Sequence, residues 1–221
     1  MKYQLLGNRL RACQSIASNH KTLLSGCNIL LLQHLFEDTL EFTNHLLNNG
    51  AKFNKILGKD YSTDQRIFAE LKKKKLPVEI INSHFEETNS DYLRNILITA
   101  LNSTKKEGRK LIIQEIGGYF SRIINSIPTD LTTTLAGVVE DTTYGYNKYK
   151  AVEAELKYPV FHVARSQLKE IEAVFVGEAI VLAFNNIMRD IGISIQGRKA
   201  LVIGYGMIGK NIARFLKLNN L

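Results

Sequence analysis

The strongest constraint on the fold is a regular alternation of short apolar segments with segments of helical periodicity. Residues 28–32 form an apolar run typical of a buried strand, and residues 34–47 carry apolar side chains at helical spacing before Asn48-Asn49-Gly50. The same alternation predicts strands at 53–57, 78–81, 111–116 and 135–139, and helices at 63–75, 91–102, 120–125 and 147–157. Strands that alternate with helices at this spacing predict an α/β fold, a doubly wound parallel sheet with helices on both faces.

The alternation stops at Tyr158-Pro159, and residues 166–191 then have the pattern of one long amphipathic helix. We therefore place a boundary between two domains near residues 159–164. The sequence predicts an α/β domain over residues 1–163, and a linker helix followed by the first β-α unit of a second domain over residues 164–221.

Composition excludes several classes of protein. The net charge of +8 comes from scattered Lys and Arg, and the one run, Lys72–Lys75, falls in the last turn of an expected helix, where cations complement the helix dipole. This distribution of charge leads us to expect no nucleic-acid partner.

The sequence has no signal-peptide pattern and no run of about 18 apolar residues, so we expect a cytoplasmic protein with no membrane partner. Cys13 and Cys27 stand outside any Cys/His cluster, so we expect no disulfide and no metal site.

A glycine motif lies near the end of the sequence. Ala200–Ile203 has the pattern of a buried strand and leads directly into Gly204-Tyr-Gly206-Met207-Ile208-Gly209, after which residues 210–217 have helical periodicity. In dinucleotide-binding folds the first glycine permits the tight turn, the second lets the backbone approach a diphosphate, and the third lets helix and strand pack closely. The motif therefore predicts a dinucleotide-binding loop, with a glycine-rich turn that binds no nucleotide as the alternative.

The ribose-binding acid of such folds lies about 20 residues beyond the glycines, at the end of the next strand. Only twelve residues follow Gly209. We therefore expect the sequence to hold only the start of a Rossmann domain.

Several separated motifs resemble those of the adenosylhomocysteinase family. Gly197–Lys210 is similar to its cofactor motif, and Val139-Glu-Asp-Thr-Thr-Tyr-Gly145 is similar to its Ser-Glu-Glu-Thr-Thr-Thr-Gly segment. The other matching segments follow in the family's order: Leu24-Ser-Gly26, His34, Gly50-Ala51, Ser62-Thr63-Asp64-Gln65, Pro77-Val78 and Glu87-Thr88. The resemblance covers most of the sequence from about residue 24 onward.

The resemblance implies a substrate domain over residues 1–163, a homo-oligomer, and the use of bound NAD to hydrolyse adenosylhomocysteine, a nucleoside thioether, to adenosine and homocysteine. It places His34 on the family's active-site histidine, Asp141 on its catalytic glutamate and Lys169 on its catalytic lysine. It also implies that NAD is held by two threonines and the glycine loop, here Thr142, Thr143, Gly204, Gly206, Met207, Ile208 and Gly209.

The sequence also departs from the family. A catalytic aspartate falls on Ile116, a second aspartate falls on Ala173 with Glu172 beside it, and a substrate-binding threonine falls on Phe36. Apolar side chains cannot transfer protons, so we expect a divergent, C-terminally truncated relative that is a poor hydrolase.

Other interpretations stay open. His34 could simply cap or pack a helix, Lys169 could be a solvated lysine, and Asp141 to Thr143 could cap the helix that follows. The whole chain could be a catalytically silent partner of an intact paralogue. It could also be related to NAD-dependent dehydrogenases of 2-hydroxy acids, which share the architecture.

Overall fold

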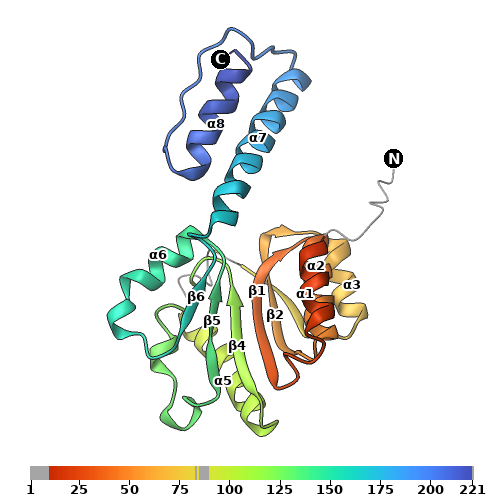
Figure 1. The fold of residues 1–221 in the computed structure, drawn as a ribbon, viewed down its shortest axis with the longest axis vertical. Coiled ribbons are helices and arrows are strands. Elements are labelled where there is room, and N and C mark those ends of the chain that lie inside the picture. The colour runs from red at the N-terminus through yellow and green to blue at the C-terminus, as the bar shows by residue number, and fades with distance from the viewer. Residues whose placement is uncertain (1–9, 83, 85–89, 221) are drawn as a thin grey trace. The chain divides into compact units, whose positions relative to one another are not determined.

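The computed structural model describes residues 10–82, 84 and 90–220, and the chain forms two compact units, Met1–His162 and Val163–Leu221. The first unit contains a six-stranded sheet, and the second contains two helices (Figure 1). Each unit is described separately below.

The sheet of the first unit has the strand order β3-β2-β1-β4-β5-β6, and every neighbouring pair is parallel. This confirms the predicted α/β fold with a parallel sheet. The chain winds from β1 toward β3 on one side and from β4 toward β6 on the other, so the order reverses between β1 and β4. The strands are β1 Cys27–Leu35, β2 Lys52–Thr63, β3 Val78–Ile81, β4 Lys110–Glu115, β5 Leu135–Glu140 and β6 Val160–His162.

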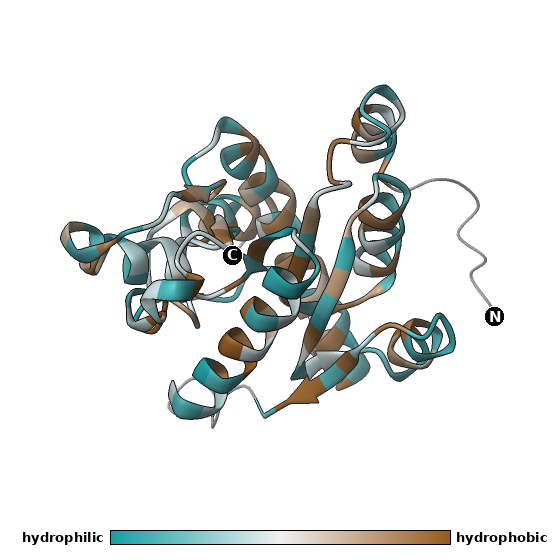
Figure 2. Ribbon diagram, turned by 90° about the horizontal axis from the view of Figure 1, so that it is seen from below, coloured by the Kyte–Doolittle hydropathy of each residue, from teal (hydrophilic) through white to brown (hydrophobic). Residues whose placement is uncertain are grey.

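Helices cover both faces of this sheet, because alternate residues of each strand point to opposite sides. Leu30 and Leu32 pack into a core with residues of α5, whereas Ile29 and Leu31 pack into a second core with residues of α3. Figure 2 shows brown, apolar segments along the strands, and helices that carry both brown and teal residues. The helices of this unit are α1 Arg11–Asn19, α2 Glu37–Asn48, α3 Gln65–Lys73, α5 Ser90–Lys106 and α6 Thr143–Ala151.

A bulge interrupts the pairing of β1 with β2 near their carboxyl ends. Gln33 pairs with Gly58, but Leu35 pairs with Thr63, so residues 59–62 of β2 lie opposite His34 alone. Gly58 allows this close approach, because an added Cβ would lie 2.4 Å from Cδ1 of the buried Leu35. The bulge places four consecutive β2 residues around one histidine.

Three expectations for this unit need correction. The helix expected at 120–125 is wrong: turns and a short 3-10 helix, Ile124–Ser126, occupy this region. The helix expected at 147–157 begins earlier, at Thr143, because the Thr142 hydroxyl accepts a hydrogen bond from Gly145 N and caps it there. The sequence pattern also missed β6, whose three residues are too few to show a period.

The second unit consists of α7, Gln167–Asp190, packed against α8, Met207–Leu218. Gly177 makes this packing close, because an added Cβ would lie 2.7 Å from Asn211 Cβ. The strand expected at 200–203 is wrong, since no strand is assigned within residues 163–220, and Leu201 and Ile203 are 86% and 92% exposed. A strand needs neighbours to pair with its backbone, and this segment has none in the described residues.

Helix α7 is long and apolar enough to cross a membrane by length and composition, a test that core helices of soluble proteins also pass. The search for an uninterrupted apolar run in the sequence did not detect it, because acidic residues break the run. Several of its large apolar side chains are exposed, including Ile171, Phe175 and Ile187.

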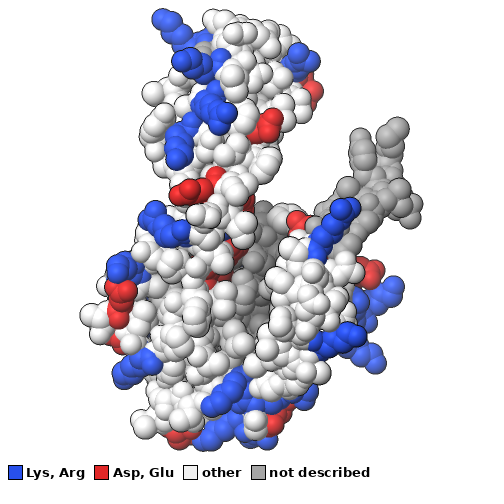
Figure 3. Space-filling model, in the orientation of Figure 1, with Lys and Arg blue, Asp and Glu red and all other residues white. Residues whose placement is uncertain are grey.

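Lysine and arginine side chains are dispersed over the surface. On the face seen in Figure 3 they form separate groups over both units rather than one continuous stripe. The charge of +8 therefore gives no single basic patch on that face of the kind that tracks a nucleic-acid backbone.

Candidate functional site

The residues expected to act on a substrate in the first unit meet at the carboxyl edge of the sheet. His34 lies near the end of β1, Gly117 and Gly118 follow β4, and Asp141 follows β5. Because parallel strands end at the same edge, and β1 and β4 flank the point where the strand order reverses, this is the place where doubly wound sheets bind ligands.

His34 is held by the bulge of β2. Its Nδ1 is hydrogen-bonded to Ser62 Oγ, and its ring lies edge-on to Tyr61 with 6.0 Å between ring centroids. Burial lowers the pKa of His34 below 6.5, the nearby Lys59 charge lowers it further, and the Asp141 charge partly offsets both. The imidazole is therefore neutral at pH 7 and can accept a proton.

The glycine turn after β4 is fixed by a buried carboxylate at the end of β5. Glu140 accepts hydrogen bonds from Gly117 N at 3.0 Å and Gly118 N at 2.9 Å, and from both the backbone N and the hydroxyl of Thr142 at 2.7 Å. Gly145 leaves room for it, since an added Cβ would lie 2.1 Å from Glu140 Cδ. Glu140 thus connects the turns that follow two neighbouring strands.

A second buried carboxylate, Glu115 at the end of β4, lies below the same turn. It accepts hydrogen bonds from Tyr119 N at 2.6 Å, from Phe120 N and from the Tyr149 hydroxyl. Burial raises the pKa of Glu115 to about 7, and repulsion from Glu140 adds to the rise. Burial, together with the Glu115 charge, also raises the pKa of Tyr149 well above 10.

The residues matched to the family's acid and threonine segment lie at the start of α6. Thr142 caps this helix through its hydroxyl, which agrees with the capping interpretation for that residue. Asp141 donates its backbone N–H to Glu115 O at 3.2 Å and is close enough to affect His34 electrostatically. Thr143 is the first residue of the helix and is partly exposed.

Two positions at which the sequence departs from the family pattern differ in their exposure to solvent. Ile116 is 1% exposed and belongs to the core cluster that packs on α5, so it is part of the hydrophobic interior. Phe36, in contrast, is 49% exposed beside the His34 ring, with 6.3 Å between the ring centroids.

Lys169 lies in the second unit, in the first turn of α7. Its Nζ is 2.7 Å from Glu172 Oε2, one turn along the helix, and its backbone N–H donates to the Ser166 hydroxyl that caps the helix. Ala173, at the position matched to an aspartate, is buried. Lys169 and Glu172 therefore form an ion pair, and the apolar Ala173 follows Glu172 in the sequence.

The glycine loop has the geometry that its sequence predicts, although the strand before it is not formed. Gly204 has φ of +94°, and Gly206 is the N-cap residue of α8. An added Cβ on Gly209 would lie 2.1 Å from Gly204 O, so only glycine fits there. Met207 and Ile208 begin the helix. Helix α8 therefore begins directly after a tight glycine turn. A helix N-terminus in this position could hold a diphosphate.

Comparison with known proteins identifies relatives of this sequence. No protein-family model matches the sequence. An adenosylhomocysteinase from Sulfolobus acidocaldarius is 29% identical over 203 residues, which cover 90% of this chain and 46% of the relative. An adenosylhomocysteinase from Thermotoga maritima is 27% identical over 194 residues, 86% of this chain and 45% of the relative.

The chain is a divergent relative of the adenosylhomocysteinases. It spans about half the length of the curated relatives it matches. An S-inosyl-L-homocysteine hydrolase from Methanopyrus kandleri is also similar, 26% identical over 193 residues that cover 86% of this chain and 45% of that protein.

The sequence analysis missed several residues of this candidate site. Lys59 is 6% exposed although its neighbours Asp60 and Tyr61 are exposed, and only the bulge explains its inward position. Glu115 and Glu140 were not selected because they fall at the ends of apolar strands. One signal in the sequence could have identified Glu115. It is a charged residue at the end of a buried strand, shortly before two consecutive glycines.

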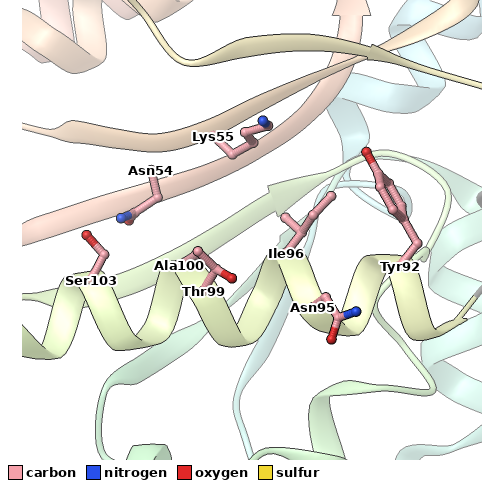
Figure 4. Close-up of a pocket in the computed structure, with 8 residues that line it drawn as sticks. All are labelled: Asn54, Lys55, Tyr92, Asn95, Ile96, Thr99, Ala100 and Ser103. Atoms are coloured by element: carbon pink, nitrogen blue, oxygen red, sulfur yellow. The ribbon is translucent and has the colours of Figure 1, made fainter.

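A groove of about 320 Å³ lies elsewhere in the unit, between β2 and α5 (Figure 4). It is near the amino half of β2, away from Ser62, and Lys55 at its rim forms an ion pair with Glu79 at 2.5 Å. It contains none of the residues matched to the family. Its lining residues are Asn54, Lys55, Tyr92, Asn95, Ile96, Thr99, Ala100 and Ser103.

The electrostatic arrangement around His34 gives a first prediction. Lys59→Met should raise the pKa of His34, because it removes a nearby positive charge, and Asp141→Asn should lower it. NMR titration of the His34 ring protons measures both changes. Lys55→Met, in the same strand but distant from the carboxyl edge, is the control and should leave the His34 titration unchanged. Equal His34 titrations in all four proteins would contradict this arrangement.

The buried Glu115 gives a second prediction. The folded state holds its proton up to about pH 7, whereas the unfolded chain releases it near 4.5, so the free energy of unfolding should fall as pH rises between these values. The decrease amounts to at most about 3 kcal/mol and levels off above pH 7. Glu115→Gln should flatten this dependence, as measured by urea unfolding from pH 4.5 to 8.

Glu155→Gln, at an exposed position, is the matched control and should keep the wild-type slope. The interpretation of Glu115 fails if Glu115→Gln and the wild type lose stability in parallel over this pH range.

Proposed function

We propose that the first unit binds the nucleoside part of an adenosylhomocysteine-like ligand at the carboxyl edge of its sheet. The observation that carries this proposal is the position of His34 and Ser62 opposite the Gly117-Gly118 turn, on the two sides of the point where strand order reverses. The names of the relatives, which include hydrolases of adenosyl- and inosyl-homocysteine, support a purine nucleoside thioether as the ligand class.

The chemistry proposed for this chain is weak hydrolysis at most. A neutral His34 can accept a proton from a ribose hydroxyl, with Asp141 near enough to stabilise the imidazolium that forms. By the resemblance alone, Lys169 of the second unit is proposed as a catalytic lysine. Ile116 and Ala173, however, place hydrocarbon at two positions where the resemblance implies carboxylates. Each missing acid or base lowers the rate by roughly 10²–10⁴-fold.

The glycine loop of the second unit is the proposed cofactor site, with NAD as the cofactor. Gly204, Gly206, Met207, Ile208 and Gly209 would receive the diphosphate, since Gly209 has no room for a side chain and α8 begins at the loop. Bound NAD would supply oxidation and re-reduction of the ribose. By the same resemblance, Thr142 and Thr143 of the first unit are proposed as NAD-binding residues.

The resemblance supports further proposals. We propose that residues 1–163 form a substrate domain and residues 164–221 the start of an NAD domain. A cytoplasmic location and assembly with a second copy or with a paralogue are proposed on the same basis.

Nucleoside binding is tested by calorimetric titration of the full chain with adenosine and with inosine. We expect saturable binding of at least one of them, and about tenfold weaker binding by His34→Ala, equivalent to about 1.4 kcal/mol. His20→Ala, an exposed histidine outside the site, is the control and should bind as the wild type does. No binding of either nucleoside, or equal affinities in wild type and His34→Ala, would refute the proposal.

Cofactor binding is tested by adding NAD to the isotope-labelled full chain. The backbone amide resonances of residues 204–209 should shift in a saturable way, and Gly209→Ala should abolish the shifts because its new Cβ would collide with Gly204 O. Lys217→Ala, in the last turn of α8, leaves the loop intact and should respond as the wild type does. If NAD moves no resonance of the loop, the loop is a turn without a cofactor role.

A further inference from the structure

A pocket of about 340 Å³ lies between α6 and β6, the strand at one edge of the sheet (Figure 1). In the strand order β4 and β5 separate it from β1, which carries His34, and it contains none of the residues matched to the family. Half of its lining residues have aromatic rings, which is typical of small-molecule sites. The aromatic residues are Tyr146, Tyr149, Tyr158 and His162.

Three of these rings are held in place by contacts within the first unit. The ring centroids of Tyr146 and His162 are 4.5 Å apart and their planes meet at 62°, an edge-to-face contact between α6 and the end of β6. Tyr149 is 3% exposed, and its hydroxyl donates a hydrogen bond to the buried Glu115. The orientation of these rings therefore does not depend on a bound ligand.

Part of the pocket is continuous with the hydrophobic core. Leu156, Tyr158 and Val160 line the pocket and also pack against the core cluster that contains Phe120 and Val138. Side chains that pack on a core keep their positions when a ligand enters or leaves. The pocket is therefore largely preformed, which lowers the entropic cost of binding.

Two polar groups of the lining have no hydrogen bond to any residue of the chain that the structure describes. They are the hydroxyl of Tyr158, which is partly buried, and the ring nitrogens of His162, which is exposed. A phenol hydroxyl can both donate and accept a hydrogen bond. Water competes less at the partly buried hydroxyl, so Tyr158 is the better partner for a polar group on a ligand.

The acidic and basic side chains of the lining neutralise each other. Lys150 forms an ion pair with Glu153, and the two side chains are 56% and 62% exposed. Among the described residues, no other Lys, Arg, Asp or Glu lines the pocket. Charge complementarity therefore favours an uncharged ligand.

We propose that this pocket binds an uncharged, planar aromatic molecule of one or two rings that carries one hydrogen-bonding group. Tyr146, Tyr149 and His162 supply the ring contacts, and the Tyr158 hydroxyl pairs with the polar group. The cavity is at the lower end of the range of about 300–1,000 Å³ for small-molecule sites, which suits one or two rings. The site is separate from the proposed nucleoside site, and neither depends on the other.

The test is an NMR titration of the isotope-labelled full chain with phenol, indole and cyclohexanol. Phenol and cyclohexanol have similar size and the same hydroxyl group, so they differ mainly in the aromatic ring. We expect phenol and indole to shift the backbone amide resonances of residues 146–158 and 160–162 in a saturable way. Both should bind at least about threefold more tightly than cyclohexanol, because ring contacts add to the effect of burial.

Two variants test the ring contacts and the hydrogen bond. Tyr146→Leu keeps an apolar side chain but removes a ring, so it should remove the preference for phenol over cyclohexanol. Tyr158→Phe keeps the packing on the core and should weaken phenol binding about threefold, because it removes the hydroxyl. Tyr144→Leu and Tyr144→Phe are the matched controls, since Tyr144 is on the same helix, is 60% exposed and does not line the pocket.

Thermal unfolding establishes that each variant is folded, and the conservative Tyr158→Phe keeps the test decisive if Tyr146→Leu does not fold. The proposal is refuted if neither aromatic compound gives saturable shifts, or if cyclohexanol binds as tightly as phenol. It is also refuted if folded Tyr146→Leu keeps the preference, or if Tyr158→Phe binds phenol as the wild type does. Adenosine binding near His34 is measured separately, so either proposal can fail while the other stands.

Discussion

Two buried carboxylates at the ends of β4 and β5 hold the backbone from which the whole carboxyl edge is built. Glu140 gathers the amides of the glycine turn and of Thr142, and Glu115 gathers those of the next two residues. Side-chain oxygens therefore do what ladder hydrogen bonds do inside the sheet: they satisfy buried backbone donors where the strands end. The turn, the start of α6 and the ring of Tyr119 all depend on these bonds.

The same arrangement has a cost, because two carboxylates in one buried region repel each other. Burial and the Glu140 charge raise the pKa of Glu115 to about 7, so this carboxyl is about half protonated near neutral pH. The charge of Glu115 therefore depends on Glu140 as well as on its own burial.

The sequence was enough to predict the parallel sheet, because buried strands of several apolar residues carry a strong signal. Most of the expected strands and helices of the first unit are formed, with ends shifted by a few residues. The failures have physical causes. Phe120, Ile123 and Ile124 are apolar because they fill the core, and not because residues 120–125 form a helix. The inward position of Lys59 depends on a bulge that exists only when β1 and β2 pair, so no local pattern could reveal it.

Residues 200–203 show the opposite limit, a strongly apolar local pattern that does not form the expected strand. The segment is apolar like a central parallel strand, yet it stays exposed and unpaired because the described part of the second unit offers no strand beside it. The turn that follows does not need such a partner. Gly204 at positive φ and Gly209 against the Gly204 carbonyl are set by contacts within six residues, so the loop forms where the strand does not. Local contacts can therefore form the glycine turn, while a strand at 200–203 would need neighbouring backbone to pair with.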